Sequence, residues 1–168
     1  MNRDPLSNSF KGITILAATV AFGFALSELP KASFSWGFFV ILAFAVIVTP
    51  RMSLTLPRSR FAISFSDAAV FLTFLIYGGP AAIVVAALES VSNCFYLRSK
   101  GFYFGKWMIP TNVSINTVSI SLTALAWNAV EPSFSFPYMS TQWIVSTVGI
   151  LALGQFLFSS AQVAIFTW

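Results

Sequence analysis

Two apolar stretches joined by the sequence Gly78-Gly79-Pro80 constrain this chain more than any other feature. Basic residues bound the pair at Arg51 and Arg98, no charge separates the two stretches, and the second holds a single acid, Glu89. A helix rises about 1.5 Å per residue, so roughly 19 residues cross the roughly 30 Å hydrocarbon layer. A soluble helical hairpin needs a charged face, so this pattern predicts a membrane hairpin.

The composition predicts an integral membrane protein. The chain has 168 residues, of which 57% are hydrophobic and only 8% are charged, whereas roughly 25% are charged in a soluble domain. The net charge of +4 comes from short basic clusters between apolar runs. Basic residues in such positions determine the orientation of membrane spans, so we expect no nucleic-acid partner.

Six apolar spans follow from the spacing of the polar breaks. We expect an all-α fold in one transmembrane domain, and the lipid bilayer as its main partner. The spans are placed at about 12–29, 34–49, 61–79, 81–97, 107–130 and 142–168. Trp36, Trp107 and Trp127 lie near span ends and are predicted to be interface anchors.

Residues 51–66 alternate between apolar and polar side chains on both sides of Pro57-Arg58-Ser59-Arg60. A period of two is typical of strands, which predicts a short hairpin at the membrane surface. The second arm fits the interfacial start of the third span equally well, and the pattern leaves both interpretations open.

The basic residues predict the orientation. With the amino terminus inside the cell, the outer segments hold only Lys31, so eight of the nine basic residues fall on the inner side, as the positive-inside rule requires. The inner ones are Arg3, Lys11, Arg51, Arg58, Arg60, Arg98, Lys100 and Lys106. Six spans then place both termini in the cytoplasm of a bacterial cell with the chain in its inner membrane.

The last span is still apolar at Trp168. We therefore expect the sequence to be part of a longer protein that continues on the cytoplasmic side, with an output domain after Trp168 as a partner.

Ala17, Ala21 and Ala25 fall four residues apart in the first span. Small side chains on one face let a neighbouring helix approach closely. Packing within the bundle explains this face, and a docking face for another subunit is the alternative.

Glu89 is the one ionisable residue well inside a span, where a charge at the bilayer centre costs about 2.5–3.5 kcal/mol. At helical spacing it shares a face with Asn93, and the next span offers Asn112, Asn116 and Ser119. Gln155 extends the set into the last span. These residues predict either a ligand-binding site centred on Glu89, Asn93, Asn112 and Asn116 or a hydrogen-bond network that only fixes helix packing.

Enzymatic chemistry is not expected. The sequence contains no histidine and one cysteine, Cys94, which excludes an internal disulfide and a Cys/His zinc cluster. It has no Gly-rich phosphate loop with a lysine and no carboxylates at a useful spacing. We therefore predict no catalytic residues, no metal and no cofactor.

The central hairpin carries a resemblance to two families. Its residues are Ile63-Ser64-Phe65-Ser66-Asp67-Ala68-Ala69-Val70-Phe71-Leu72, then Tyr77-Gly78-Gly79-Pro80-Ala81-Ala82, and Glu89. This pattern resembles the multi-spanning membrane region that precedes GGDEF or HD-GYP domains in bacterial signalling proteins. It is also similar to the substrate-binding S components of energy-coupling-factor vitamin transporters.

The first resemblance implies a non-catalytic sensory or anchoring input domain that relays a cue to a cytoplasmic output domain. The second implies a membrane subunit that binds a vitamin or other small molecule, with the face of Ala17, Ala21 and Ala25 against a coupling subunit. A membrane anchor without a ligand is the third alternative. We favour the input domain.

Overall fold

The computed structural model describes residues 5–29, 35–52, 54–55, 62–63, 66–102, 105 and 107–167. Over these residues the chain forms six α-helices and one two-stranded hairpin. The helices are α1 (Pro5–Ser27), α2 (Trp36–Ala43), α3 (Ser66–Tyr77), α4 (Gly79–Ser99), α5 (Met108–Val130) and α6 (Thr141–Thr167). A π-helical turn, η2 (Phe44–Val48), and a 3-10 turn, η3 (Thr49–Met52), continue α2, and a second 3-10 turn, η4 (Glu131–Ser133), follows α5.

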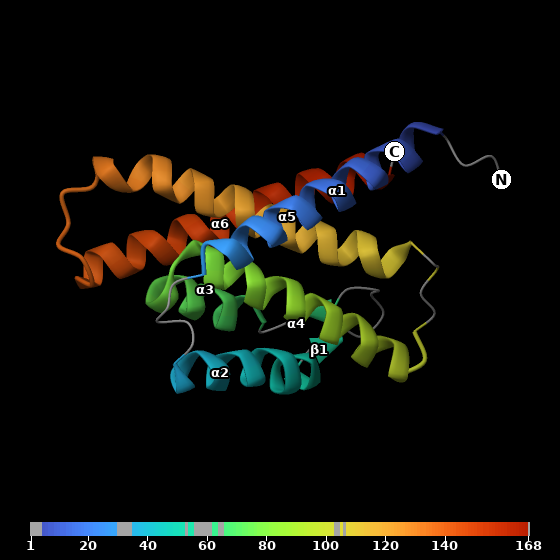
Figure 1. Ribbon diagram of the computed structural model, residues 1–168, viewed down its shortest axis with the longest axis horizontal. Helices are drawn as coiled ribbons and strands as arrows, with labels where there is room; N and C mark the ends of the chain where they lie inside the picture. The colour runs from blue at the N-terminus through green and yellow to red at the C-terminus, as the bar shows by residue number, and fades with distance from the viewer. Residues whose placement is uncertain are drawn as a thin grey trace.

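Helix α4 lies in the middle of the bundle (Figure 1). It contacts α1, α3 and α5 as well as η2 and η3, whereas α6 packs mainly on α5 with smaller contacts to α1 and α3. Small and β-branched side chains from Ala81 to Ala87 make α4 narrow, and all seven are buried. A narrow helix lets several neighbours pack against it at once.

Four helices in the described part of the chain are long and apolar enough to cross a membrane. They cover Ser9–Ser27, Gly79–Ser99, Met108–Ser133 and Thr141–Ile165. The predicted helical fold is therefore confirmed, and the chain has the candidate spans of a multi-pass membrane protein.

The predicted spans over 34–49 and 61–79 correspond to shorter helices. Trp36–Met52 and Asp67–Tyr77 are apolar helices of 10–17 residues. The third span was predicted too long, because α3 has 12 residues and reaches only about 18 Å at 1.5 Å per residue. Gly78, at φ +84°, ends it, since glycine adopts this conformation without steric cost.

The alternating segment forms a hairpin. Strand β1 (Leu54–Thr55) pairs antiparallel with β2 (Ala62–Ile63), and Leu54 faces Ile63. Of the two interpretations of residues 51–66, the structure supports the hairpin, and α3 begins after it at Ser66. Arg58 and Arg60 lie outside the described residues, as do Arg3, Lys31 and Lys106.

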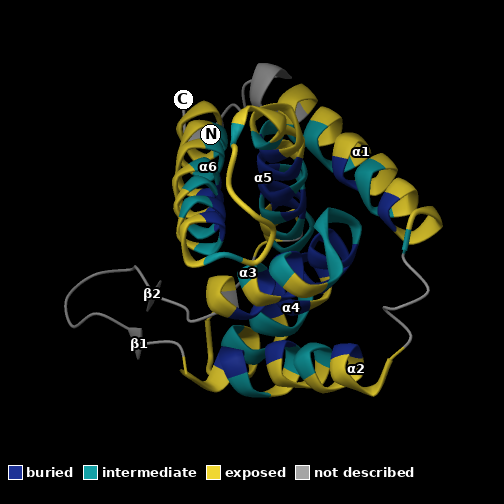
Figure 2. Cartoon of the chain, turned by 90° about the vertical axis from the view of Figure 1, so that its left-hand side faces the viewer, coloured by how far each residue is buried: buried dark blue, intermediate teal, exposed yellow. Residues whose placement is uncertain are grey.

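The outer surface is apolar, unlike that of a soluble protein, and polar side chains lie among the apolar ones in the interior. Large apolar side chains are exposed along the outer faces of α1, α2 and α6 (Figure 2), among them Leu16, Val40 and Phe156. The interior holds Glu89 and a series of Ser, Thr and Gln side chains. Lipid is as apolar as a protein core, so such a surface suits a bilayer and not water.

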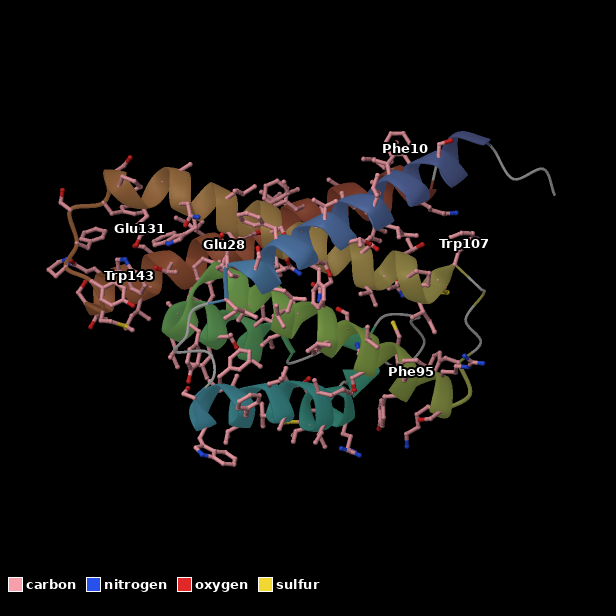
Figure 3. The ribbon with its side chains drawn as sticks, viewed as in Figure 1. Phe10, Glu28, Phe95, Trp107, Glu131 and Trp143 are labelled. Atoms are coloured by element: carbon pink, nitrogen blue, oxygen red, sulfur yellow. The ribbon has the colours of Figure 1, made fainter. Side chains whose placement is uncertain are left out.

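The tryptophans divide into two groups. Trp36 and Trp107 are exposed, as expected of interface anchors, but Trp127 and Trp143 are buried and pack edge to face with ring centroids 5.8 Å apart. The anchor interpretation is therefore wrong for Trp127. Figure 3 shows Trp143 beside Glu131 at one end of the bundle, where its indole Nε1 donates to Glu131 Oε1 at 3.4 Å.

Pro50 explains the π-helical turn and a contact between helices. In an α-helix the carbonyl of Val46 would accept a hydrogen bond from the backbone N–H of residue 50. Because residue 50 is proline, which has no N–H, this bond is missing. Ser92 of α4 donates its hydroxyl to this carbonyl at 2.6 Å. Thr49 donates its backbone N–H to Phe44 O and its hydroxyl to Ala45 O, and every carbonyl from Phe44 to Val46 has a donor.

We predict that Ser92→Ala destabilises the protein by about 1–2 kcal/mol, because Val46 O is left without a donor in an apolar environment. In a Pro50→Ala background the same change should cost much less, since the alanine introduced at position 50 supplies an N–H to Val46 O. Unfolding of all four proteins in detergent measures this coupling. Ser99→Ala is the control, because Ser99 bonds only within its own helix, and strictly additive effects would contradict the account.

Helices α5 and α6 approach closely at Gly154. A methyl group on Gly154 would lie 2.9 Å from Thr123 Cγ2 and 3.0 Å from Thr123 Oγ1. Thr123 is fully buried and its hydroxyl donates to Ser119 O at 2.8 Å. Any side chain at position 154 must therefore push α6 away from α5.

We predict that Gly154→Ala lowers the stability by about 1–3 kcal/mol through overpacking. Adding Thr123→Ala should recover most of that loss, because it removes both atoms that the new methyl group meets. Gly149→Ala on the same helix is the control, since a methyl group there has nothing within 4 Å. Equal unfolding midpoints for Gly154→Ala and Gly149→Ala would contradict the close approach.

Candidate functional site

Glu89 lies at the midpoint of the 21-residue α4 and is only 2% exposed. The helix is about 31 Å long, so a perpendicular α4 places this carboxyl near the centre of the bilayer. A carboxyl group in that position should face the bundle interior and not lipid. The burial of Glu89 agrees with this requirement.

Asn116 of α5 forms the centre of a hydrogen-bond network beside Glu89. Its Nδ2 donates to Ser90 Oγ at 2.5 Å and to Ala86 O at 3.3 Å, both on α4. Its Oδ1 accepts from Nε2 of Gln155 on α6 at 2.6 Å. One amide therefore connects three candidate membrane-spanning helices.

The orientation of these two amides follows from their partners. A backbone carbonyl can only accept, so Ala86 O requires Nδ2 of Asn116 to face α4 and Oδ1 to face α6. Gln155 must then present its Nε2 to Asn116 and turn its Oε1 elsewhere. That Oε1 is buried and has no hydrogen-bond partner in the described part of the structure.

A second polar contact lies two turns further along α6. Nε2 of Gln162 donates to Ser119 Oγ at 2.8 Å and to the carbonyls of Ile115 and Phe158 at 3.4 and 3.2 Å. Gln162 was not predicted from the sequence, although its spacing of seven residues from Gln155 places the two amides on one face of α6. Ser90 was missed as well.

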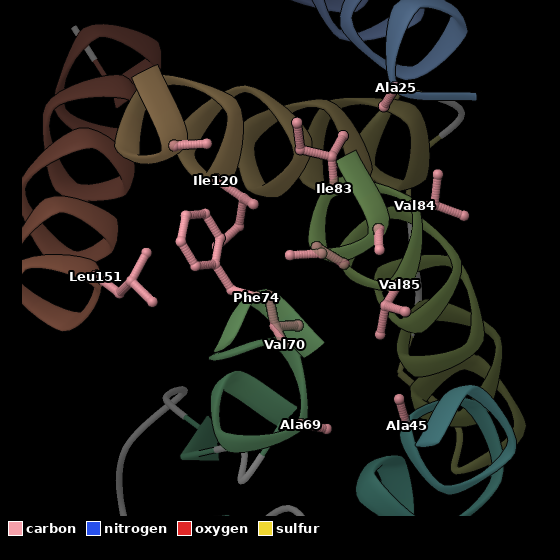
Figure 4. Packing of buried hydrophobic residues seen from close by; sticks show 14 of the residues in the cluster. Ala25, Ala45, Ala69, Val70, Phe74, Ile83, Val84, Val85, Ile120 and Leu151 are labelled. Carbon is pink, nitrogen blue, oxygen red and sulfur yellow. The ribbon is translucent and has the colours of Figure 1, made fainter. Parts of the chain in front are cut away.

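An apolar layer closes the network on one side. Leu151, Ile120, Phe74 and Val70 point toward a common centre between α3, α5 and α6 (Figure 4). Leu151 lies one turn before Gln155 on α6. Water is thereby excluded from this side of the amides, and hydrogen bonds are stronger in such an environment.

The structure places the four predicted site residues differently. Glu89 is buried, Asn116 occupies the centre of the network, and Asn93 is half-buried with an Oδ1 that has no hydrogen-bond partner among the described residues. Asn112 is exposed, and its side chain interacts with the thiol of Cys94. Asn116 is therefore joined to Ser90 and Gln155, whereas no hydrogen bond described here joins Asn112 to that network.

The predicted alanine face of α1 is rotated. Ala25 is fully buried and Ala21 is half-buried, but Ala17 is exposed. The buried side of α1 runs through Ala18 and Ala25, seven residues apart, which is nearly two full turns. Residues four positions apart point about 40° apart around the helix axis. Ala17 is two such steps from Ala25 and therefore lies outside the packed face.

The chemistry of the site is hydrogen bonding. Its groups are amides, hydroxyls and one carboxyl, in a setting shielded from water. Among the described residues, no three or more His, Cys, Asp or Glu side chains gather in a group that could hold a metal ion. The arrangement can hold helices in register and can bind a polar ligand.

Comparisons with known proteins add no name to this picture. The chain matches no protein-family model, no curated protein and no solved structure.

Proposed function

We propose that this chain is the non-catalytic membrane input domain of a bacterial signal-transduction protein, and that it relays a cue by shifting α6 against α5. One observation carries the proposal: a single amide, that of Asn116, joins α4, α5 and α6 near their midpoints. A change at Ser90 on α4 reaches α6 through this residue.

The way α6 is held supports this relay. Its contacts to helices other than α5 are small, and its position on α5 depends on the amides of Gln155 and Gln162 and on the close approach of Gly154 to Thr123. Hydrogen bonds between membrane helices are worth about 0.6 kcal/mol each on average. A ligand that changes these hydrogen bonds therefore needs only a modest interaction energy to alter the polar contacts that join α6 to α5.

We predict that Asn116→Leu changes the distance between spin labels at Ser99 and Ser160. These positions are exposed on α4 and α6, and the labels are attached to cysteines in a Cys94→Ala background. The leucine cannot bond Ser90 or Gln155, so α6 should shift or occupy several positions. Asn128→Leu, at an exposed asparagine of α5, is the control, and identical distance distributions in both variants would overturn the relay.

The proposal includes six spans with both termini in the cytoplasm, with Trp36–Met52 and α3 as the two short ones. A six-span chain places Met52 inside the cell, whereas a chain with only the four long spans and the same amino terminus places it outside. Ser35 and Ser135 are outside in both arrangements. Met52 therefore distinguishes six spans from four.

We predict that a membrane-impermeant maleimide labels Ser35→Cys and Ser135→Cys in intact cells and does not label Met52→Cys until the membrane is opened. Each variant carries Cys94→Ala, and all three positions are exposed on the protein. Labelling of Met52→Cys in intact cells would leave four spans. A reporter fused after Trp168 should report the cytoplasm in either case.

A further inference from the structure

Gln155 presents a buried acceptor that no described residue of the protein uses. The residue is 8% exposed, and its Oε1 has no hydrogen-bond partner among the described residues. The amide cannot turn over to satisfy this atom, because Asn116 Oδ1 requires a donor from Gln155. Burying an acceptor without a partner is unfavourable, so each such group in a native structure requires an explanation.

Asn93 presents a second such acceptor on α4. Its Oδ1 is buried and has no hydrogen-bond partner in the described residues. At 100° per residue, the direction of Asn93 from the helix axis lies between those of Glu89 and Ser90. Ser90 bonds Asn116, and Asn116 bonds Gln155, so this network joins the two helices that carry the oxygens left without a partner among the described residues.

Glu89 adds a carboxyl group to this side of α4, one turn before Asn93. A carboxylate offers about four sites that accept hydrogen bonds, so Glu89 can serve a ligand alongside its other contacts. The groups available to a ligand are then two amide oxygens and a carboxylate. All three accept hydrogen bonds, and the carboxylate favours a positive charge.

We propose that Gln155, Asn93 and Glu89 bind the primary ammonium group of a small molecule between α4, α5 and α6. An ammonium group carries three N–H donors, no acceptor and one positive charge, which matches two amide oxygens and one carboxylate. This inference rests on the proposed function and names the class of cue. Because Gln155 is bonded directly to Asn116, the ligand acts on the residue that connects the three helices.

The test is thermal unfolding of the purified full chain in detergent, followed by tryptophan fluorescence, with methylammonium chloride as the probe. The unfolding midpoint should rise with a saturable dependence, by roughly 5–10 °C at a hundredfold excess over Kd. Tetramethylammonium chloride has the same charge without N–H donors and should give no rise. Sodium chloride at equal ionic strength should give none either, and acetamide, a neutral donor, should be much weaker.

Variants locate the site. Asn93→Ala should weaken methylammonium binding by roughly tenfold or more, the loss of one hydrogen bond to a charged donor, and it should fold because Asn93 is only half-buried. Gln155→Leu and Glu89→Gln should also weaken it. Gln162→Leu should retain full binding, because Gln162 bonds α5 two turns away from Gln155.

Each other outcome overturns the inference. No rise with methylammonium means that a water or nothing satisfies Gln155, and an equal rise with acetamide means that the site binds neutral donors. A rise that survives in Asn93→Ala and Gln155→Leu places binding elsewhere. These results leave the spin-label distances untouched, so failure of the ammonium site and failure of the relay through Asn116 are distinguished.

Discussion

The bond between Asn116 and the carbonyl of Ala86 fixes much of the centre of this protein. A carbonyl only accepts, so it determines which end of the Asn116 amide faces α4 and which faces α6. That choice fixes the orientation of the Gln155 amide, whose Oε1 then has no partner within the described part of the chain. A single backbone oxygen of α4 thereby determines which groups donate and which accept in the hydrogen bonds that join the three helices.

The bundle combines two ways of holding membrane helices together. Lipid offers no hydrophobic driving force between helices, so association depends on close packing and on polar contacts. The close packing occurs where Gly79 meets Ala124 and where Gly154 meets Thr123, and the polar contacts occur at Asn116 and Ser92. Close packing tolerates little displacement of the helices, whereas an amide can exchange one hydrogen-bond partner for another. The amides are therefore the contacts of the interface that can change partners.

The sequence predicts the helices best where charged or proline-rich segments mark their ends. Helix α5 runs from Met108 to Val130, against a predicted 107–130, because a basic segment and a proline-rich loop bound it. Helix α3 was predicted too long because Phe61 to Ile63 are apolar and fit either a strand or a helix, and only their pairing with β1 decides between them. The π-helical turn was not predicted, since the donor that completes it, Ser92, lies 46 residues away from Val46.

Only some residues of the candidate site could be predicted from the sequence. Glu89 and Asn116 stand out because charged and amide side chains are costly in a span, but Ser90 does not, because serine is common in membrane helices. Asn112 and Asn116 lie one turn apart and look equivalent in sequence. Which of them faces the network depends on how α5 is rotated against α4 and α6. That rotation depends on contacts between helices, such as that of Gly154 with Thr123, which no local pattern reveals.

The energies at this centre suit a switch. Each hydrogen bond of the network contributes about 0.6 kcal/mol on average, and a coupling between two sites is typically 1–3 kcal/mol. A ligand that adds or replaces two or three bonds beside Asn116 therefore acts with an energy similar to that of the whole network. A centre made of interlocked apolar side chains would resist such a change, because each displaced side chain would lose its packing. Under the relay that we propose, the polar centre would have a role that leucines could not fill: it would hold α6 firmly enough to define one arrangement and weakly enough to permit another.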